Sequence, residues 1–179
     1  GKQLSHIGIA VKTHTTVADN HAAILGALTA AAKTADIIII TGGLGPTQDD
    51  ITKIVLCDYF QMKLVVNSEV AKNVEKIFKK FGARLLAVNK KQAEVPDGCT
   101  VLPNASGTAP GMLFEKNEKI YVSLPGVPYE MKGIMQAGAL PFITNRFNLG
   151  AIVHRTILTQ GIGESFLAEK VSGWENGLE

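Results

Sequence analysis

A glycine-rich segment that runs into two adjacent carboxylates is the part of this sequence best suited to chemistry. It reads Thr-Gly-Gly-Leu-Gly-Pro-Thr-Gln-Asp-Asp over residues 41–50. Glycines let a backbone approach a ligand closely and adopt positive φ, and free N–H groups at a helix start attract phosphate. We therefore expect the segment to bind phosphate through these residues: Thr41, Gly42, Gly43, Gly45 and Thr47. The alternative is an ordinary tight turn, because the segment matches neither a P-loop nor a G-x-G-x-x-G fingerprint.

The two carboxylates, Asp49 and Asp50, indicate a metal rather than a bare anion. Two negative side chains beside a phosphate would repel it unless a divalent cation such as Mg, Mn or Co lay between them. We expect Asp49 and Asp50 to be the catalytic residues and the metal ligands. Adjacent helical residues point about 100° apart, so one of the two is expected to face the site. The alternative is that both only complement the dipole of the helix that follows.

The elements around this segment predict an α/β fold. Residues 37–40 are four consecutive isoleucines, and such a run is typical of a strand buried on both faces in a parallel sheet. A helix over residues 48–60, capped by Thr47, is expected to follow. Strand and helix alternate along most of the chain, which predicts a three-layer α/β/α fold with a mainly parallel sheet and a small β-hairpin. Ligands of such sheets bind at the carboxyl ends of the strands.

The remaining elements are predicted from periodicity and turn residues. We expect strands over 6–13, 99–102 and 151–160, and a hairpin formed by 112–115 and 119–124. We expect helices over 20–33 with Asp19 as N-cap, over 68–81 with Ser68 as N-cap, over 129–146 with an interruption near Gly138 and Pro141, and from 161 onward. Asn89 to Glu94 suggests a short helical turn, and Pro96-Asp97-Gly98 a turn.

Further polar residues are candidates for binding a phosphate or a ribose. They lie in the segment 89–94, in a glycine-bearing loop at 104–111, in a turn at 124–128 and in the first turn of the helix that follows it. They are Lys91, Gln92, Asn104, Gly107, Thr108, Gly126 and Glu130. Hydroxyls and backbone N–H groups of such loops bind anions. The alternatives are a plain surface loop, a solvated lysine and, for Glu130, a partner of a helix dipole.

Composition restricts the classes of function. The 179 residues are 46% apolar and 19% charged, which is typical of a globular protein. Eighteen basic and 16 acidic residues give a net charge of +2, too balanced for a nucleic-acid-binding face. The sequence contains no membrane-length apolar run and no signal peptide. The sequence predicts no structural zinc site, because its two cysteines form no C-x-x-C pattern and its four histidines have no ligand spacing. Two reduced cysteines are typical of the cytoplasm, and we expect a cytoplasmic protein.

The segment TGGLGPTQDDIT resembles the signature of the molybdopterin-binding (MoaB/MogA)-like fold, and its Leu-Gly-Pro-Thr-x-Asp-Asp-x-Thr form is similar to the competence/damage-inducible protein A (CinA) branch. Other segments resemble that branch in order, and they begin at Thr16, Asn89, Pro96, Asn104, Leu124 and Gly161. The resemblance implies metal-dependent hydrolysis of ADP-ribose to AMP and ribose 5-phosphate. It also implies a small phosphate-bearing nucleotide or pterin as ligand, and a homodimer or homotrimer.

Two alternatives to the hydrolase remain. One is a nucleotide- or pterin-binding regulatory module without turnover. The other is molybdopterin adenylyl transfer, but the relatives with that activity usually have Thr-Gly-Gly-Thr-Gly and an Arg-Asp pair where this sequence has Leu44 and Asp49-Asp50.

The resemblance also divides the chain. Residues 1–149 resemble the CinA-type domain, and residues 150–179 resemble the beginning of a following α/β domain. The family usually begins with a strand that carries a Gly-Asp-Glu loop and with an Asp-Thr-Asn turn. Neither motif occurs in this sequence, so we expect the site formed by this chain to lack one acidic wall.

Overall fold

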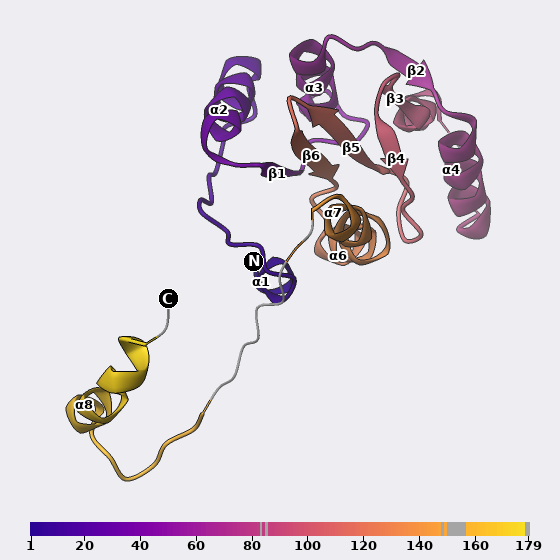
Figure 1. Ribbon diagram of the computed structural model, residues 1–179. Helices are drawn as coiled ribbons and strands as arrows, with labels where there is room; N and C mark the ends of the chain where they lie inside the picture. The colour runs from indigo at the N-terminus through magenta and orange to yellow at the C-terminus, as the bar shows by residue number, and fades with distance from the viewer. Residues whose placement is uncertain (83, 85, 148, 150–156, 178–179) are drawn as a thin grey trace.

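A four-stranded sheet forms the centre of the molecule in the computed structural model (Figure 1). The structure describes residues 1–82, 84, 86–147, 149 and 157–177. Within them the strand order is β1-β6-β5-β4. The bounds are Ile37–Thr41 for β1, Thr100–Leu102 for β4, Gly111–Lys116 for β5 and Lys119–Leu124 for β6.

The pairing of the strands makes the sheet mixed. β1 runs parallel to β6, whereas β5 is antiparallel to both β6 and β4. The α/β class is confirmed, but the expectation of a mainly parallel sheet is wrong for the described strands. The predicted hairpin is present and belongs to the main sheet itself, so its antiparallel strands occupy the centre. Asn117 and Glu118 form its two-residue turn with φ of 52° and 63°, as hairpins with a right-handed twist favour.

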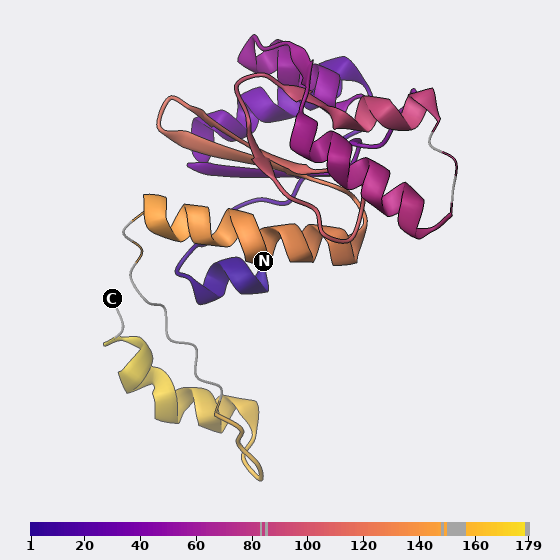
Figure 2. The same cartoon turned by 90° about the vertical axis from the view of Figure 1, so that its right-hand side faces the viewer.

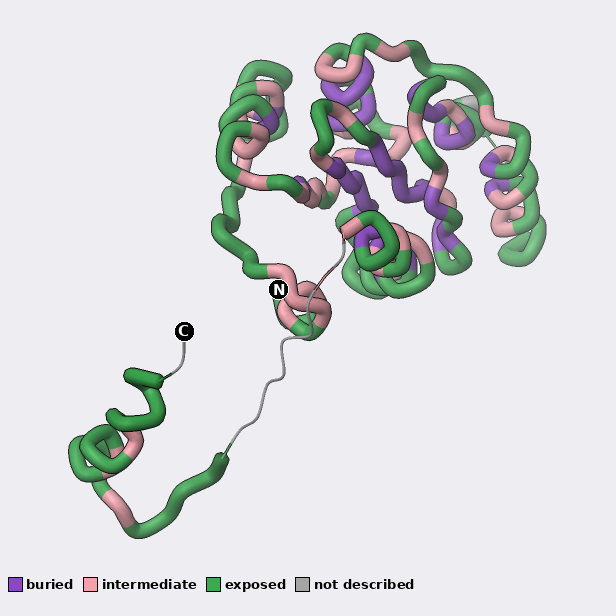
Figure 3. The backbone as a smooth tube through the Cα atoms, in the orientation of Figure 1, coloured by how far each residue is buried: buried purple, intermediate pink, exposed green. Residues whose placement is uncertain are grey.

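Three helices cover one face of the sheet: α2 (His21–Thr34), α3 (Thr52–Phe60) and α4 (Ser68–Lys80). Their buried residues pack with every second residue of β5 and β6, because side chains alternate between the faces of a strand. This core contains Leu28, Val55, Leu56, Val74, Met112, Phe114 and Tyr121. Figure 3 shows the buried residues concentrated on the strands and on the inner sides of these helices.

A nearly continuous helix covers the other face, formed by α6 (Pro128–Ile134), a π segment (Met135–Ala139, η2) and α7 (Leu140–Arg146) (Figure 2). The predicted interruption near Gly138 is this π segment, which changes the helical register without ending the helix. The short helix α1 (Lys2–His6) lies beside it, and Leu4, Ile7 and Ile9 pack against the second core, which includes Leu113, Val122, Leu124, Ile134 and Ile143. The three-layer α/β/α arrangement is therefore confirmed.

A second, two-stranded sheet has no counterpart in the predictions. It pairs β2 (Leu64–Val66) with β3 (Glu94–Pro96) in antiparallel fashion. The helix α5 (Ala87–Lys90) and the 3₁₀ turn η1 (Lys91–Ala93) come directly before β3, close to the predicted helical turn. Three-residue strands are too short to give a clear alternation of apolar residues, and this explains why both escaped prediction.

Several predicted boundaries are wrong. Residues 6–13 form no strand, because α1 ends at His6 and Gly8 takes a φ of 83°. Asn20 rather than Asp19 caps α2, accepting a hydrogen bond from the N–H of Ala23 at 2.9 Å. Asn67 rather than Ser68 caps α4 through two such bonds. In both cases asparagine and its neighbour are comparable capping residues, so the backbone conformation decides between them.

The last described element is α8 (Glu164–Glu175), which contains no buried residue. It confirms the predicted final helix. Of the predicted strand 151–160, residues 151–156 lie outside the described part, and residues 157–160 are not in a strand. Among the described residues no helix has the length and apolarity to cross a membrane.

We expect Phe114→Ala to destabilise the fold by about 3–5 kcal/mol. The Phe114 side chain is 1% exposed, and its ring stacks on that of Phe60 with 4.4 Å between centroids. The loss should appear as a lower urea midpoint in unfolding followed by circular dichroism. Phe81→Ala is the matched control, because Phe81 is 74% exposed, and it should change the stability by less than about 0.5 kcal/mol.

Candidate functional site

A pocket of about 340 Å³ lies where β1 and β6 end. These strands are parallel and in register, with Thr41 opposite Leu124, so their carboxyl ends reach the same edge of the sheet. The loop after each strand contributes one wall, and η1, the 104–109 loop and the first turn of α6 complete the pocket. The lining residues are Gly42, Gly43, Leu44, Gly45, Asp50, Gln92, Thr108, Ala109, Pro125, Gly126, Val127 and Glu130.

The loops after β1 and β6 pack closely on each other. The N–H of Gly42 donates to the carbonyl of Leu124 at 2.9 Å. A Cβ atom on Gly126 would lie 3.4 Å from the Cα of Gly42. Gly42 and Gly43 have φ of 100° and 66°, in a region that side chains disfavour. The positive φ of Gly42 and Gly43 therefore requires glycine, whereas a Cβ atom on Gly126 would make only ordinary contact with the neighbouring loop.

Asp50 is held by a compact turn that precedes α3. Its Oδ2 accepts hydrogen bonds from the N–H of Thr47 at 3.1 Å and from the Thr47 hydroxyl at 2.6 Å. Its carboxylate also lies against Gly45, where a Cβ atom would collide with it. The prediction that Thr47 caps a helix over 48–60 is wrong, since α3 begins at Thr52. The turn instead aims Asp50 at the pocket and leaves Oδ1 without a hydrogen bond from any described residue.

Asp49 differs from Asp50 although it is the next residue. It is exposed and does not line the pocket. This geometry agrees with the expectation that only one of the two carboxylates faces the site. Asp50 is the one that lines the pocket.

Glu130 forms a second acidic wall from the first turn of α6. Its Oε2 accepts a hydrogen bond from Nδ2 of Asn104 at 2.7 Å, and the same Nδ2 donates to the carbonyl of Ala109 at 2.8 Å. A Cβ atom on Gly107 would collide with the Glu130 carboxylate. Asn73 of α4 holds this loop, donating to the carbonyls of Asn104 and Gly107.

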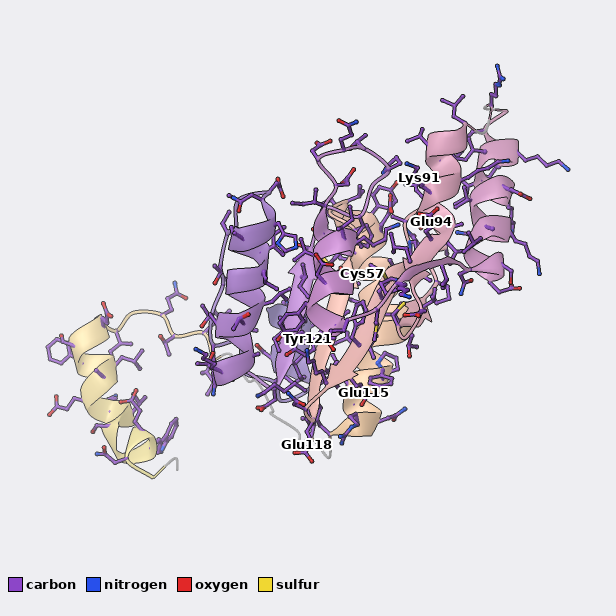
Figure 4. All side chains as sticks on the ribbon, turned by 90° about the horizontal axis from the view of Figure 1, so that it is seen from above. Cys57, Lys91, Glu94, Glu115, Glu118 and Tyr121 are labelled. Carbon is purple, nitrogen blue, oxygen red and sulfur yellow. The ribbon has the colours of Figure 1, made fainter. Side chains whose placement is uncertain are left out.

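Six predicted residues do not line the pocket, and three of them are Thr41, Asp49 and Lys91. Lys91 lines a different cavity of about 290 Å³ together with Val66, Val74 and Glu75. Figure 4 shows Lys91 and Glu94 close together, away from Glu118 at the tip of the hairpin. Gln92, the residue after Lys91, is 5% exposed and lines the pocket. The expected counter-charge for a phosphate is therefore not among the described residues lining the pocket.

The structure brings together eight predicted residues in the pocket lining: Gly42, Gly43, Gly45, Asp50, Gln92, Thr108, Gly126 and Glu130. Thr47, Asn104 and Gly107 stand behind them in contact with the two carboxylates. Sequence reasoning missed the buried Leu44 and Lys53. Leu44 sits within the predicted loop, whereas no local signal distinguishes Lys53 from a surface lysine.

The lining residues suit a ligand that brings phosphate oxygens and a cation. No described group of three or more His, Cys, Asp or Glu side chains could hold a metal by itself. Mg²⁺ commonly uses only one or two carboxylates together with water and substrate phosphates. Asp50 and Glu130 each keep one carboxylate oxygen that no described residue occupies, so this donor set fits a cation of that kind.

We expect Asn104→Asp to destabilise the fold by about 1–3 kcal/mol at pH 8. The change replaces a donor to Glu130 with a second carboxylate of the same shape. Repulsion would raise the pKa of one of the two carboxyls in the folded state, so the loss should shrink as pH falls through that raised pKa. Urea unfolding at pH 8 and pH 5 measures it.

Asn67→Asp is the matched control, because aspartate caps a helix as well as asparagine does. It should change stability little at either pH. An Asn104→Asp variant with the same stability loss at both pH values would contradict the described contact with Glu130.

Comparisons with known proteins place this geometry in a family. The family model described as a probable molybdopterin binding domain matches residues 1–145. A CinA-like protein from Flavobacterium psychrophilum is 45% identical over 178 residues, which are 99% of this chain and 43% of that protein. The chain thus spans less than half the length of the curated relatives it matches.

Solved structures agree with this relationship. The crystal structure of CinA from Thermoplasma acidophilum has a TM-score of 0.69 and 30% identity, covering 79% of this chain and 82% of that one. A molybdenum cofactor biosynthesis protein B, 16% identical with a TM-score of 0.54 over 81% of this chain and 78% of that one, shares the fold. The chain therefore belongs to the family of probable molybdopterin-binding domains, in its CinA-like branch.

Proposed function

We propose that this chain hydrolyses ADP-ribose-type nucleoside diphosphate sugars with the help of a divalent cation, Mg, Mn or Co. Water would add across the pyrophosphate bond of ADP-ribose and release AMP and ribose 5-phosphate. The observation that carries the proposal is the lining of the pocket. It combines a glycine loop with two carboxylates, Asp50 and Glu130, and has no basic side chain among its described residues.

Each group in the pocket has a role in this proposal. Backbone N–H groups of the glycine loop bind phosphate oxygens, and Gln92 and Thr108 supply additional donors. A divalent cation, when bound, supplies the positive charge that offsets the pyrophosphate, and Asp50 and Glu130 would hold it. Thr47 and Asn104 keep these carboxylates oriented through the hydrogen bonds described above. Orientation of this kind is a large part of catalysis, because it removes the need for rearrangement during the reaction.

A second candidate is binding of a pterin or nucleotide without turnover. The family description supports it, since it refers to molybdopterin binding. Glu130 also favours it, because a carboxylate oxygen can accept from the amino and N–H groups of a pterin. Molybdopterin adenylyl transfer has less support, because the buried Leu44 and the Asp49-Asp50 pair replace the residues usual for that activity. A homodimer or homotrimer and a cytoplasmic location stay predictions.

We expect the purified protein to release AMP from ADP-ribose when Mg²⁺, Mn²⁺ or Co²⁺ is present. The release of AMP should stop when EDTA is added. Asp50→Asn should lower kcat by about 10²–10³-fold, the usual cost of removing one charge-stabilising group. Asp49→Asn should cost far less, because Asp49 lies outside the pocket. AMP is measured by chromatography.

Asp36→Asn is the control for removing a carboxylate elsewhere, since Asp36 is exposed at the other end of β1 and pairs with Lys119. Equal losses in Asp50→Asn and Asp36→Asn would contradict the proposed role of Asp50. ADP-ribose binding by calorimetry without AMP release would reject the hydrolase and support the second candidate.

A further inference from the structure

Lys53 is a buried charge in an unusual setting. It is the second residue of α3 and only 8% exposed. Its Nζ donates to the carbonyl of Glu94 at 3.0 Å and more weakly to that of Lys91 at 3.5 Å. No ion pair joins it to a carboxylate in the described part of the chain. Burying an ammonium group among carbonyls alone costs free energy, so an unspecialised position would be expected to carry an apolar residue.

Burial lowers the pKa of Lys53, and the Glu94 and Asp50 carboxylates partly oppose this effect. Asp50 is one of the carboxylates that line the pocket. Lys53 is also only three residues from Asp50 along the chain. The residue therefore connects to the pocket on one side through the turn that precedes α3.

On its other side Lys53 contacts the residues that flank Gln92. The two carbonyls that it binds belong to Lys91, directly before Gln92, and to Glu94, two residues after it. The carbonyl of Lys91 also accepts a hydrogen bond from the N–H of Glu94, which closes the turn η1. The ammonium of Lys53 thus binds the carbonyl of the first residue of η1 and the carbonyl of the residue that follows η1, which offsets part of the cost of burying it. Figure 4 shows Lys91 and Glu94 together at this place in the fold.

Gln92 is the lining residue that depends on this anchor. It is the middle residue of η1, is 5% exposed and lines the same pocket as the glycine loop. Its position relative to Asp50 depends on how η1 is fixed to α3. The hydrogen bonds of Lys53 link the two elements at that point.

We propose that Lys53 is a positioning residue, which fixes η1 to the start of α3 and thereby holds Gln92 at the correct distance from Asp50 for ligand binding. The effect on ligand binding rests on the proposed function. The anchoring of η1 does not, and it can be tested without a ligand.

Hydrogen exchange measured by mass spectrometry tests the anchor. In Lys53→Met, which keeps the length and removes the charge, amides of residues 91–97 should exchange about tenfold faster or more, as expected for loss of a hydrogen bond to a charged group. Lys53→Arg, which retains the donors, should show a smaller change. Lys116→Met is the matched control, because Lys116 is another partly buried lysine, and it donates to the carbonyl of Tyr59 at 2.8 Å. It should leave residues 91–97 unchanged.

Unchanged exchange over 91–97 in Lys53→Met would overturn the proposal, as would an equal increase in Lys116→Met. If Lys53→Met does not fold, Lys53→Arg decides. The proposal is supported if the amides of residues 91–97 exchange at most slightly faster in Lys53→Arg than in the wild type. Exchange as fast there as in a peptide of the unfolded chain overturns it.

A double-mutant cycle tests the effect on the ligand, with ADP-ribose and Mg²⁺ as the probe in calorimetry. Lys53→Met and Gln92→Ala should each weaken binding by about tenfold, and the double variant should bind no more weakly than the weaker single variant. Additive losses would show that Lys53 does not act through Gln92 and would overturn the proposal. If the wild type itself does not bind ADP-ribose, the proposed function fails, and the hydrogen-exchange result alone decides on Lys53.

Discussion

The parallel pairing of β1 with β6 is the constraint on which the rest of the site depends. Strands 37–41 and 119–124 are far apart in the chain, and their register sets Thr41 beside Leu124. The glycine loop and the Pro125-Gly126 turn consequently leave the sheet side by side, joined by the bond from Gly42 to Leu124. A shift of one residue would turn the alternating side chains of β6 toward the wrong cores. The two cores on either side of the sheet therefore also fix the position of the pocket.

Two carboxylates that line the pocket, Asp50 and Glu130, are presented in the same physical way. Asp50 lies against Gly45 and accepts from Thr47, and Glu130 lies against Gly107 and accepts from Asn104. In each pair, the missing side chain of glycine gives the carboxylate room, while a neighbouring donor restricts its rotation. Each carboxylate retains one oxygen that no residue in the described part of the chain occupies, and this oxygen can bind a ligand. A binding site organised in this way requires little reordering of side chains when a ligand enters, which favours affinity.

Local chemistry explains which predictions succeeded. The isoleucine run, the hairpin around Asn117 and the helix after Asn67 depend on residues near one another in sequence, and they were predicted to within a few residues. The predicted start of the helix at residue 48 is wrong, because the Asp50 carboxylate accepts a hydrogen bond from the N–H of Thr47. This bond forms a turn where a helix was expected. The β2–β3 sheet was missed because its two short strands are brought together only by packing.

The sequence by itself determined the α/β class, the glycine loop and the family resemblance, since these depend on local conformational preferences and on ordered motifs. Only the tertiary structure decided between neighbours such as Asp49 and Asp50, or Lys91 and Gln92. Successive residues of a turn or helix point in different directions, and their identities do not reveal which direction faces a pocket. The burial of Lys53 was decided in the same way. The packing of η1 against α3 excludes water from a side chain that would otherwise be hydrated at the surface.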